Sequence, residues 1–369
     1  MAKRTPIYDE HIRRGGKMVV YADYELPVDY KGGGLIPEHE AVRGAVGVFD
    51  VSHMGEIWVN GNDATSYTNT VFTGDVSKLQ DGECVYGMMC KEDGGVVDDL
   101  LIYKYNEKKY LYVVNGANIE KDWAWVNDKK GNFDVELTNA TENIAEIAVQ
   151  GPKAQDTMQK LVDFDLDTLK FYHHMEAKVG GVECIISRTG YTGEDGFEVY
   201  PYSKDGEKLY NEIMNAGEEF GIKPCGLGCR DTLRFEAALP LYGHELSETV
   251  TPVHAGLKMF LGFDKKENWI GKDALKKMAE EGPSQKIIGL ELKGKGIARE
   301  GARVEKDGKD IGYVTTGYLS PTLGKCIANV LIDVGEAVIG NKVEVVVRNK
   351  KIPAEIISKK YLAKKTKSK

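Results

Sequence analysis

The sequence contains no long hydrophobic run and no strongly basic body. No tract of about eighteen apolar residues occurs, so no membrane-spanning helix is predicted. Residues 1–6 lack the apolar segment of a secretory signal, and we therefore expect a cytoplasmic protein without a membrane partner. The formal charge of −8, with no basic stripe, argues against a nucleic-acid partner. Basic residues gather in 359–369, which predicts a solvated tail or, alternatively, a contact with an acidic protein.

Familiar motifs for metal and nucleotide chemistry are absent as well. The six cysteines are spaced neither as a small disulfide scaffold nor as paired zinc ligands, and none of the seven histidines lies in His-Glu-x-x-His. The sequence has no phosphate-binding Gly-x-x-x-x-Gly-Lys-Ser/Thr loop, no Gly-x-Gly-x-x-Gly turn and no Gly-x-Ser-x-Gly nucleophile turn. These absences argue against a metallohydrolase, a nucleotide-binding enzyme and a serine hydrolase of the usual kind.

The length and the hydrophobic pattern predict several folded domains. A chain of 369 residues exceeds what one core usually serves, so two or three domains with a pocket between them are expected. Strand-like and helix-like segments alternate without a steady rhythm, which favours an α+β fold over a doubly wound sheet. From about residue 286 the pattern changes to short β-rich runs separated by glycines, which predicts a small final β-barrel or sandwich.

The most informative stretch is residues 94–103, where two acids stand inside an apolar, strand-like run. Alternation along a strand sends Asp98 and Asp99 to opposite faces and places Asp99 beside Leu101 and Tyr103. An ionised group that is buried without a partner costs several kcal/mol, so one of the acids should face a cavity. The alternative is that the pair marks the exposed start of the strand after a Gly-Gly turn.

Two further stretches carry polar groups at close spacing. Residues 189–198 form a glycine-spaced segment with two aromatic residues and three acids, suited to close approach of a flat ligand or, alternatively, to an acidic surface turn. Residues 223–237 predict a glycine-rich entry into a helix on which Arg230 and Arg234 point the same way. Two such arginines either bind a carboxylate ligand or form internal salt bridges.

In combination these stretches resemble one family. The order of the motifs is similar to that in the glycine-cleavage T-protein family of aminomethyltransferases, and the similarity extends over nearly the whole chain apart from the basic tail. The motifs that carry the resemblance are residues 50–55, 94–103, 190–198, 226–237, 241–245 and 320–325, with 4–8, 115–122 and 149–152 in support.

The resemblance implies a fold. Proteins of this family form an α+β, three-domain cloverleaf around a central folate site. We therefore expect a discontinuous first α+β domain from residues 1–50 and 140–250, and a second from 51–139. A C-terminal domain is expected from 251–369, with a β-barrel from about residue 285 and the basic tail at its end.

The resemblance also implies the roles of individual residues. The family's catalytic aspartate is the second acid of the Asp-Asp pair, which is Asp99 here, placed at N10 of tetrahydrofolate. Glu198 is expected to hold the donor edge of the pterin. The remaining residues implied at the folate site are Met54, Tyr86, Asn115, Tyr191, Arg230 and Arg299. Arg230 is expected at the carboxylate end of the ligand, with Arg299 as a second candidate from the last domain.

The family's donor is an aminomethyl group on the lipoyl arm of the H-protein, and tetrahydrofolate is the co-substrate. No metal, flavin or pyridoxal cofactor is implied. Two relatives with other functions remain as alternatives: a folate-dependent demethylase of a small methylated compound, and a non-enzymatic folate-binding protein of iron–sulfur assembly. The sequence departs from the family pattern at Asp23, Tyr24, Cys229 and His244. These positions concern the donor side more than Asp99 and Glu198.

Overall fold

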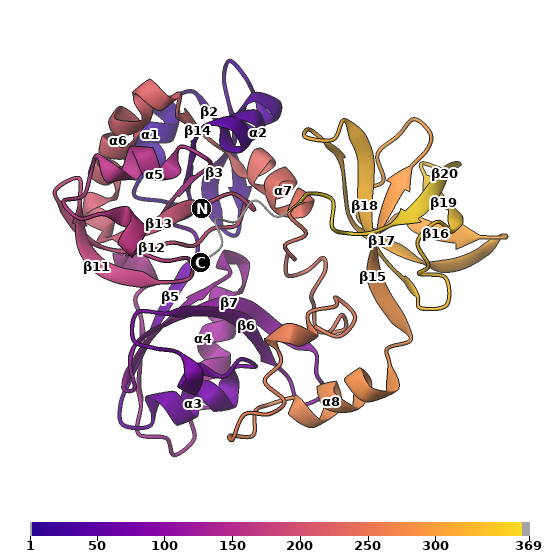
Figure 1. Ribbon diagram of the computed structural model, residues 1–369, viewed down its shortest axis with the longest axis horizontal. Coiled ribbons are helices and arrows are strands. Elements are labelled where there is room, and N and C mark those ends of the chain that lie inside the picture. Colours follow the sequence, from indigo (N-terminus) through magenta and orange to yellow (C-terminus); the bar gives the residue numbers. More distant parts are fainter. Residues whose placement is uncertain (1, 364–369) are drawn as a thin grey trace.

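The computed structural model describes residues 2–363, which form two sheet-based parts and a barrel (Figure 1). Basic residues 364–369 of the predicted tail lie outside the described part. Within that part, no helix is long and apolar enough to cross a membrane. The mixed helix-and-strand class and the C-terminal barrel were both predicted, and both are confirmed.

A six-stranded sheet is built from strands on both sides of residues 55–139. Its strand order is β11 (His174–Val179), β12 (Val182–Ser187), β13 (Gly196–Pro201), β10 (Ile147–Gln150), β4 (Gly47–Asp50) and β14 (Lys223–Pro224). A smaller sheet near the N-terminus has the order β1 (Lys3–Arg4), β3 (Tyr24–Tyr30) and β2 (Gly16–Tyr21). The domain boundaries themselves stay predictions.

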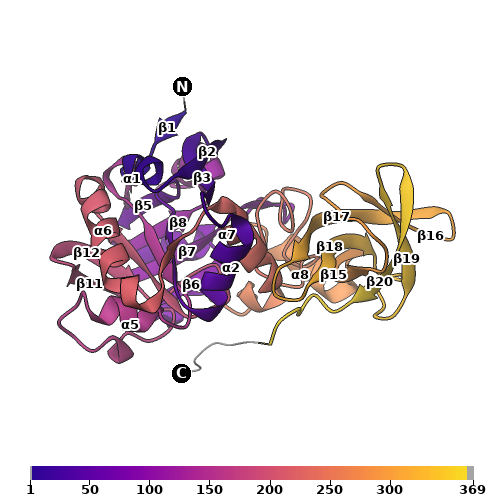
Figure 2. The ribbon, with the colours of Figure 1, turned by 90° about the horizontal axis from the view of Figure 1, so that it is seen from above.

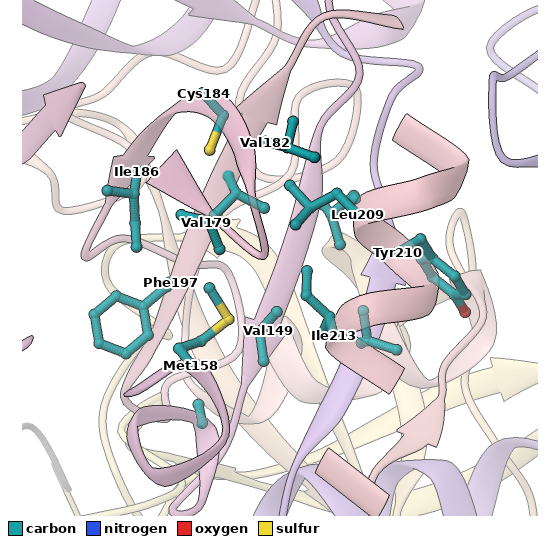
Figure 3. Packing of buried hydrophobic residues seen from close by; sticks show 14 of the residues in the cluster. Val149, Met158, Val179, Val182, Cys184, Ile186, Phe197, Leu209, Tyr210 and Ile213 are labelled. Carbon is teal, nitrogen blue, oxygen red and sulfur yellow. The ribbon is translucent and has the colours of Figure 1, made fainter. Parts of the chain in front are cut away.

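Helices cover both faces of the six-stranded sheet. These are α1 (Tyr8–Arg13), α2 (Leu35–Gly44), α5 (Ala154–Gln159), α6 (Gly206–Gly217) and α7 (Leu227–Glu236). Helix α6 carries its apolar residues at helical spacing, so Leu209 and Ile213 point together into the core, where they lie near Val149 and Met158 (Figure 3). The side chains of α2 and α7 pack on the other face through Val42 and Leu233.

The intervening chain forms a five-stranded sheet. Its order is β6 (Cys84–Cys90), β7 (Val96–Asn106), β8 (Lys109–Val114), β5 (Gly55–Asn60) and β9 (Glu136–Asn139). Helices α3 (Ala64–Val71) and α4 (Ile119–Asp128) pack on one face through residues such as Tyr67 and Val126. The opposite face meets the six-stranded sheet through Tyr103, Ile185 and Tyr200. Two sheets thus lie against each other, and β7 is buried between the helices and the neighbouring sheet.

After α7 the chain runs through α8 (Lys272–Glu281) into a closed barrel. The barrel order is β15 (Gln285–Leu292), β18 (Lys325–Asp333), β17 (Lys309–Ser320), β16 (Arg303–Lys306), β19 (Lys342–Val347) and β20 (Lys350–Ile357). The segment after β20 runs back from the barrel toward the centre of the molecule (Figure 2). Lys359 donates a hydrogen bond to the carbonyl of Ala255, and Tyr361 donates one to Ala328. The prediction of a solvated tail is therefore wrong for its first residues, because polar partners and an aromatic contact with Phe235 hold them.

Candidate active site

A cavity of about 260 Å³ lies where the two sheets meet the segment between α7 and α8. Seven of the eight predicted site residues line it: Met54, Tyr86, Asp99, Asn115, Tyr191, Glu198 and Arg230. Met54 directly precedes β5, Tyr86 lies on β6, Asp99 lies on β7 and Asn115 directly follows β8. Tyr191 lies in the loop before β13, Glu198 on β13 and Arg230 on α7. The fold therefore brings together residues that are far apart in the sequence.

The two acids of β7 point in opposite directions. Asp99 faces the cavity, accepts a hydrogen bond of 2.8 Å from the Tyr86 hydroxyl and one of 3.2 Å from Asn115 Nδ2. Asp98 points toward α4 and accepts hydrogen bonds from the backbone and side chain of Asn115 and from Asn118 Nδ2. The exposed fraction is 8% for Asp99 and 0% for Asp98, so the alternative of an exposed strand start is wrong.

The surroundings of Asp99 change its acidity. Burial is the largest cause and the nearby Asp98 carboxyl the second, and together they raise the pKa of Asp99 to about 7, although the hydrogen bonds from Tyr86 and Asn115 act in the opposite direction. A carboxyl group with a pKa near neutrality can take up and release a proton at the pH of most cells. Asp99 is thus a suitable acid–base group facing the cavity.

A second group of acids lies across the cavity. Glu198, on β13, accepts a hydrogen bond from the Thr189 hydroxyl, and burial raises its pKa. Glu146, directly before β10, also lines the cavity, and burial followed by the charge of Glu198 raises its pKa well above the usual value. Sequence reasoning missed Glu146. The signal was present, since this acid interrupts an apolar strand-like run at 144–149 as Asp98 and Asp99 do at 94–103.

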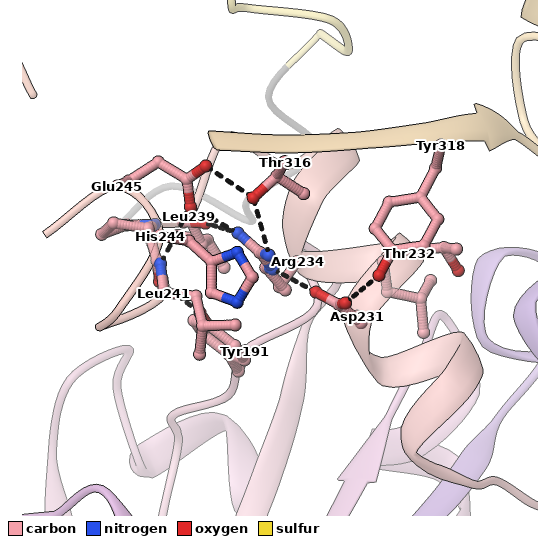
Figure 4. Close-up of polar contacts among 12 residues, drawn as sticks. Tyr191, Asp231, Thr232, Arg234, Leu239, Leu241, His244, Glu245, Thr316 and Tyr318 are labelled. Atoms are coloured by element: carbon pink, nitrogen blue, oxygen red, sulfur yellow. Dashed lines mark hydrogen bonds and ion pairs between the residues drawn. The ribbon is translucent and has the colours of Figure 1, made fainter. Parts of the chain in front are cut away.

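The two arginines of α7 have different surroundings. Arg230 lines the cavity, and its guanidinium lies 4.8 Å from the centroid of the Tyr191 ring. Arg234 is buried and forms ion pairs with Glu245 at 2.7 Å and with Asp231 at 2.6 Å (Figure 4). Because ion pairs already neutralise its charge, Arg234 joins α7 to the following segment, and Arg230 is the arginine that faces the cavity.

Arg299 is the one predicted site residue that the structure does not bring to the cavity. Its guanidinium lies 4.8 Å from the centroid of the Tyr318 ring and donates a hydrogen bond to the carbonyl of Gly317. It lines a separate hollow of about 970 Å³ at the barrel, which is formed by residues 294–302 and 346–353. The barrel therefore places Arg299 outside the group of residues around Asp99.

The residues that depart from the family pattern lie away from Asp99 and Glu198. Tyr24 and Asp23 line a polar hollow between the N-terminal sheet and the residues flanking α4 and β9. The thiol of Cys229 is buried in contact with the carbonyl of Gly226. His244 Nδ1 is 2.9 Å from the carbonyl oxygen of Thr315 on the barrel. None of these side chains lines the central cavity. Among residues 2–363, no cluster of three or more His, Cys, Asp or Glu side chains could hold a metal ion.

A cavity enclosed by three parts of the chain and lined by a buried carboxyl group whose pKa is near neutrality is typical of enzymes that act on an enclosed ligand. The model of the GCVT N-terminal domain matches residues 7–265, and that of the glycine cleavage T-protein C-terminal barrel domain matches residues 285–362. The chain belongs to the glycine cleavage T-protein family, and its activity is that of an aminomethyltransferase.

Known relatives match the chain over its full length. An aminomethyltransferase of Thermoanaerobacter pseudethanolicus is 52% identical over 363 residues, which are 98% of each chain. An aminomethyltransferase of Clostridium botulinum (strain Okra / Type B1) is 48% identical over 100% of this chain and 99% of its own. The crystal structure of glycine cleavage system aminomethyltransferase T from Bartonella henselae superposes with a TM-score of 0.92 at 28% identity and covers 99% of both chains. The predicted family and function are thereby confirmed, and nothing in these matches favours the demethylase or the non-enzymatic alternative.

Proposed function

We propose that tetrahydrofolate binds in the central cavity and receives the methylene group of an aminomethyl-lipoyl arm presented by the H-protein. The family membership of the chain supports this assignment, and the relatives are bacterial enzymes, so we place the reaction in the cytoplasm. The observation that carries the proposal is the position of Asp99, a buried carboxyl group with a pKa of about 7 that faces the cavity opposite a second set of acids.

The side chains around the cavity suit a reduced pterin. A carboxylate can accept two parallel hydrogen bonds from the amidine-like edge of such a ring, and we assign this contact to Glu198. Tyr86, Tyr191 and Met54 offer aromatic and apolar surface for the faces of the ring. Arg230 is assigned to the carboxylate end of the ligand, and its charge partly offsets the rise that burial causes in the pKa of Glu198. Arg299 is not part of this assignment because it lies outside the cavity.

Asp99 is assigned to proton transfer at N10. The transferred carbon loses its bonds to sulfur and nitrogen and gains bonds to N5 and N10, while two N–H protons of the folate leave with the lipoyl thiol and with ammonia. An ionised Asp99 orients N10 and takes up its proton as the new bond forms. Asn115 and Tyr86 hold this carboxylate by hydrogen bonds, so that it is already oriented when the donor arrives. The surrounding apolar and aromatic groups exclude water from the reacting atoms.

The substitution Asp99→Asn tests this assignment because it keeps the shape of the side chain and removes the base. Release of ammonia from aminomethylated H-protein and tetrahydrofolate should fall by about 10²–10⁴-fold, the usual contribution of a positioned acid–base group. The affinity for tetrahydrofolate, measured by calorimetry, should change little. Asp128→Asn is the matched control, since its carboxyl lies on the surface at the end of α4.

Two results would oppose the proposal. Equal losses of folate binding and turnover in Asp99→Asn would make Asp99 a binding residue. A folded wild-type protein that binds folate, releases no ammonia above the uncatalysed rate and yields 5-methyltetrahydrofolate from a small methylated amine would be the demethylase instead.

A further inference from the structure

A pair of buried carboxyl groups lies behind Asp99, on the side away from the cavity. Asp98 projects from β7 and Asp122 from α4, and both have an exposed fraction of 0%. The two carboxyl groups are neighbours, close enough for each to shift the pKa of the other. Within residues 2–363, neither oxygen of Asp122 receives a hydrogen bond from an N–H group or a hydroxyl. This pair has no role in the proposed proton transfer at N10.

One of the two groups must be protonated. Two buried carboxylates side by side repel each other strongly, so one member of the pair holds a proton. Asp98 already accepts three hydrogen bonds, at 2.9 Å from the backbone of Asn115, 2.9 Å from its side chain and 2.6 Å from Asn118. These donors stabilise a carboxylate at Asp98, whereas Asp122 has no such donors. Asp122 is therefore the protonated member of the pair.

The charged groups near Asp122 support this distribution. Burial is the largest cause and the neighbouring Asp98 the second, and together they raise the pKa of Asp122 to about 11. The Asp99 carboxyl also raises the pKa of Asp122, whereas the charge of Lys121 on the same helix lowers it. The Lys121 ammonium group itself is held by the carbonyl of Val97 and lies 4.0 Å from the centroid of the Tyr242 ring. It does not donate to Asp122.

Asn115 connects the buried pair to Asp99. The Nδ2 group of Asn115 lies 2.9 Å from Asp98 Oδ1, 2.9 Å from the carbonyl oxygen of Asp99 and 3.2 Å from Asp99 Oδ1. An amide has two N–H bonds, which these three oxygens share, so the position of Asp98 decides how the amide is turned. A change at Asp98 must therefore reach the carboxyl group of Asp99.

We propose that Asp122 is a positioning residue for the transfer reaction: it stays protonated, donates to Asp98, and keeps Asp98 as the carboxylate that holds Asn115 against Asp99. This inference rests on the proposed role of Asp99 as the acid–base group. Burial raises the pKa of Asp98, and loss of the donor at position 122 removes the largest interaction that lowers it, so Asp98 takes up a proton more readily. The negative charge beside Asp99 is then reduced, and Asp99 becomes a stronger acid and a weaker base.

Two substitutions separate the donor from the size of the side chain. Asp122→Asn keeps an N–H donor for Asp98, whereas Asp122→Leu keeps a similar volume without one. We expect the acidic limb of the pH profile of turnover to stay in place in Asp122→Asn and to shift down by about one pH unit in Asp122→Leu, with a lower plateau and an unchanged KM for tetrahydrofolate. Identical profiles for the two variants would overturn the proposal, because a purely structural role would not depend on the donor.

An infrared measurement keeps the test decisive if Asp122→Leu does not fold. At about pH 9, Asp99 is ionised and Asp122 still protonated, so one protonated-carboxyl band of the wild type should be missing from the spectrum of Asp122→Asn. The same band should remain in Asp99→Asn and in the surface control Asp128→Asn. A spectrum of Asp122→Asn that retains the band overturns the inference. Full turnover in Asp99→Asn, with the band still dependent on Asp122, would instead refute the proposed function alone.

Discussion

Replacing Asp122 by asparagine should make the free energy of unfolding less dependent on pH. In the native protein the pair of Asp98 and Asp122 holds one proton. Burial and the neighbouring Asp98 carboxyl raise the pKa of Asp122 to about 11. In the unfolded chain an aspartate titrates near pH 4, about its model value, so at neutral pH both groups are ionised. The folded state thus binds one proton more than the unfolded state, and this pair makes stability fall as the pH rises.

The size of this effect follows from linkage. Because the folded state binds one more proton, the free energy of unfolding changes by about −1.4 kcal/mol per pH unit at 25 °C. This slope holds over the whole interval between the unfolded and the folded pKa. Between pH 6 and pH 8, both inside that interval, the wild type should lose about 2.7 kcal/mol through the pair. Asp122→Asn cannot carry the proton and should not show this loss. Other buried acids, such as Glu56 and Glu146, contribute equally to both proteins and cancel in the difference.

Urea unfolding followed by tryptophan fluorescence is a suitable assay. Trp58, Trp123 and Trp125 lie in the five-stranded sheet and its helix α4, so three of the four tryptophans report on the part that contains the pair. The difference in unfolding free energy between Asp122→Asn and wild type should grow steadily from pH 6 to pH 8. Asp128→Asn, which changes an exposed acid of the same helix, should show the same pH dependence of the unfolding free energy as the wild type. If Asp122→Asn also shows the wild-type pH dependence, the shared proton is refuted.

Two further substitutions test the ligand site and the assembly around it. Glu198→Gln replaces a charged acceptor and should weaken tetrahydrofolate binding by about 10–100-fold in a fluorescence titration, as expected for hydrogen bonds to a charged group; unchanged affinity would remove Glu198 from the pterin contact. Arg234→Met leaves Glu245 without its buried partner and should lower the unfolding free energy by about 3–5 kcal/mol, measured by denaturant unfolding. The double variant Arg234→Met/Glu245→Gln should recover part of this loss, and no recovery would mean that the ion pair is not the cause.

Local geometry made part of the site predictable from the sequence. Side chains alternate along any strand, so the opposite directions of Asp98 and Asp99 follow once residues 96–106 form β7. The same reasoning correctly groups Asp99 with Leu101 and Tyr103 on the face that meets the six-stranded sheet. The closed barrel was predictable for a similar reason, because short apolar runs separated by glycines favour many short strands.

Contacts between distant segments were not predictable in this way. Arg230 and Arg234 share a helix, and only the position of Glu245 in the following segment shows which one is neutralised. The placement of Arg299 depends on how the barrel is oriented, which no local pattern reports. Asp122 has no signal in the sequence as a partner of Asp98, since the contact arises from the packing of α4 on the sheet.

Three aspartates in adjacent positions of the fold differ in charge because they receive different numbers of hydrogen-bond donors. Asp98 accepts three N–H groups and can remain a carboxylate in spite of burial, whereas Asp122 accepts none and keeps its proton. Asp99 accepts one hydroxyl and a shared amide, and it lies between these cases with a pKa of about 7. Burying three acids costs stability that apolar side chains would not cost. The arrangement is therefore best explained by what it provides, a carboxyl group that can change its protonation state at neutral pH beside a fixed negative charge.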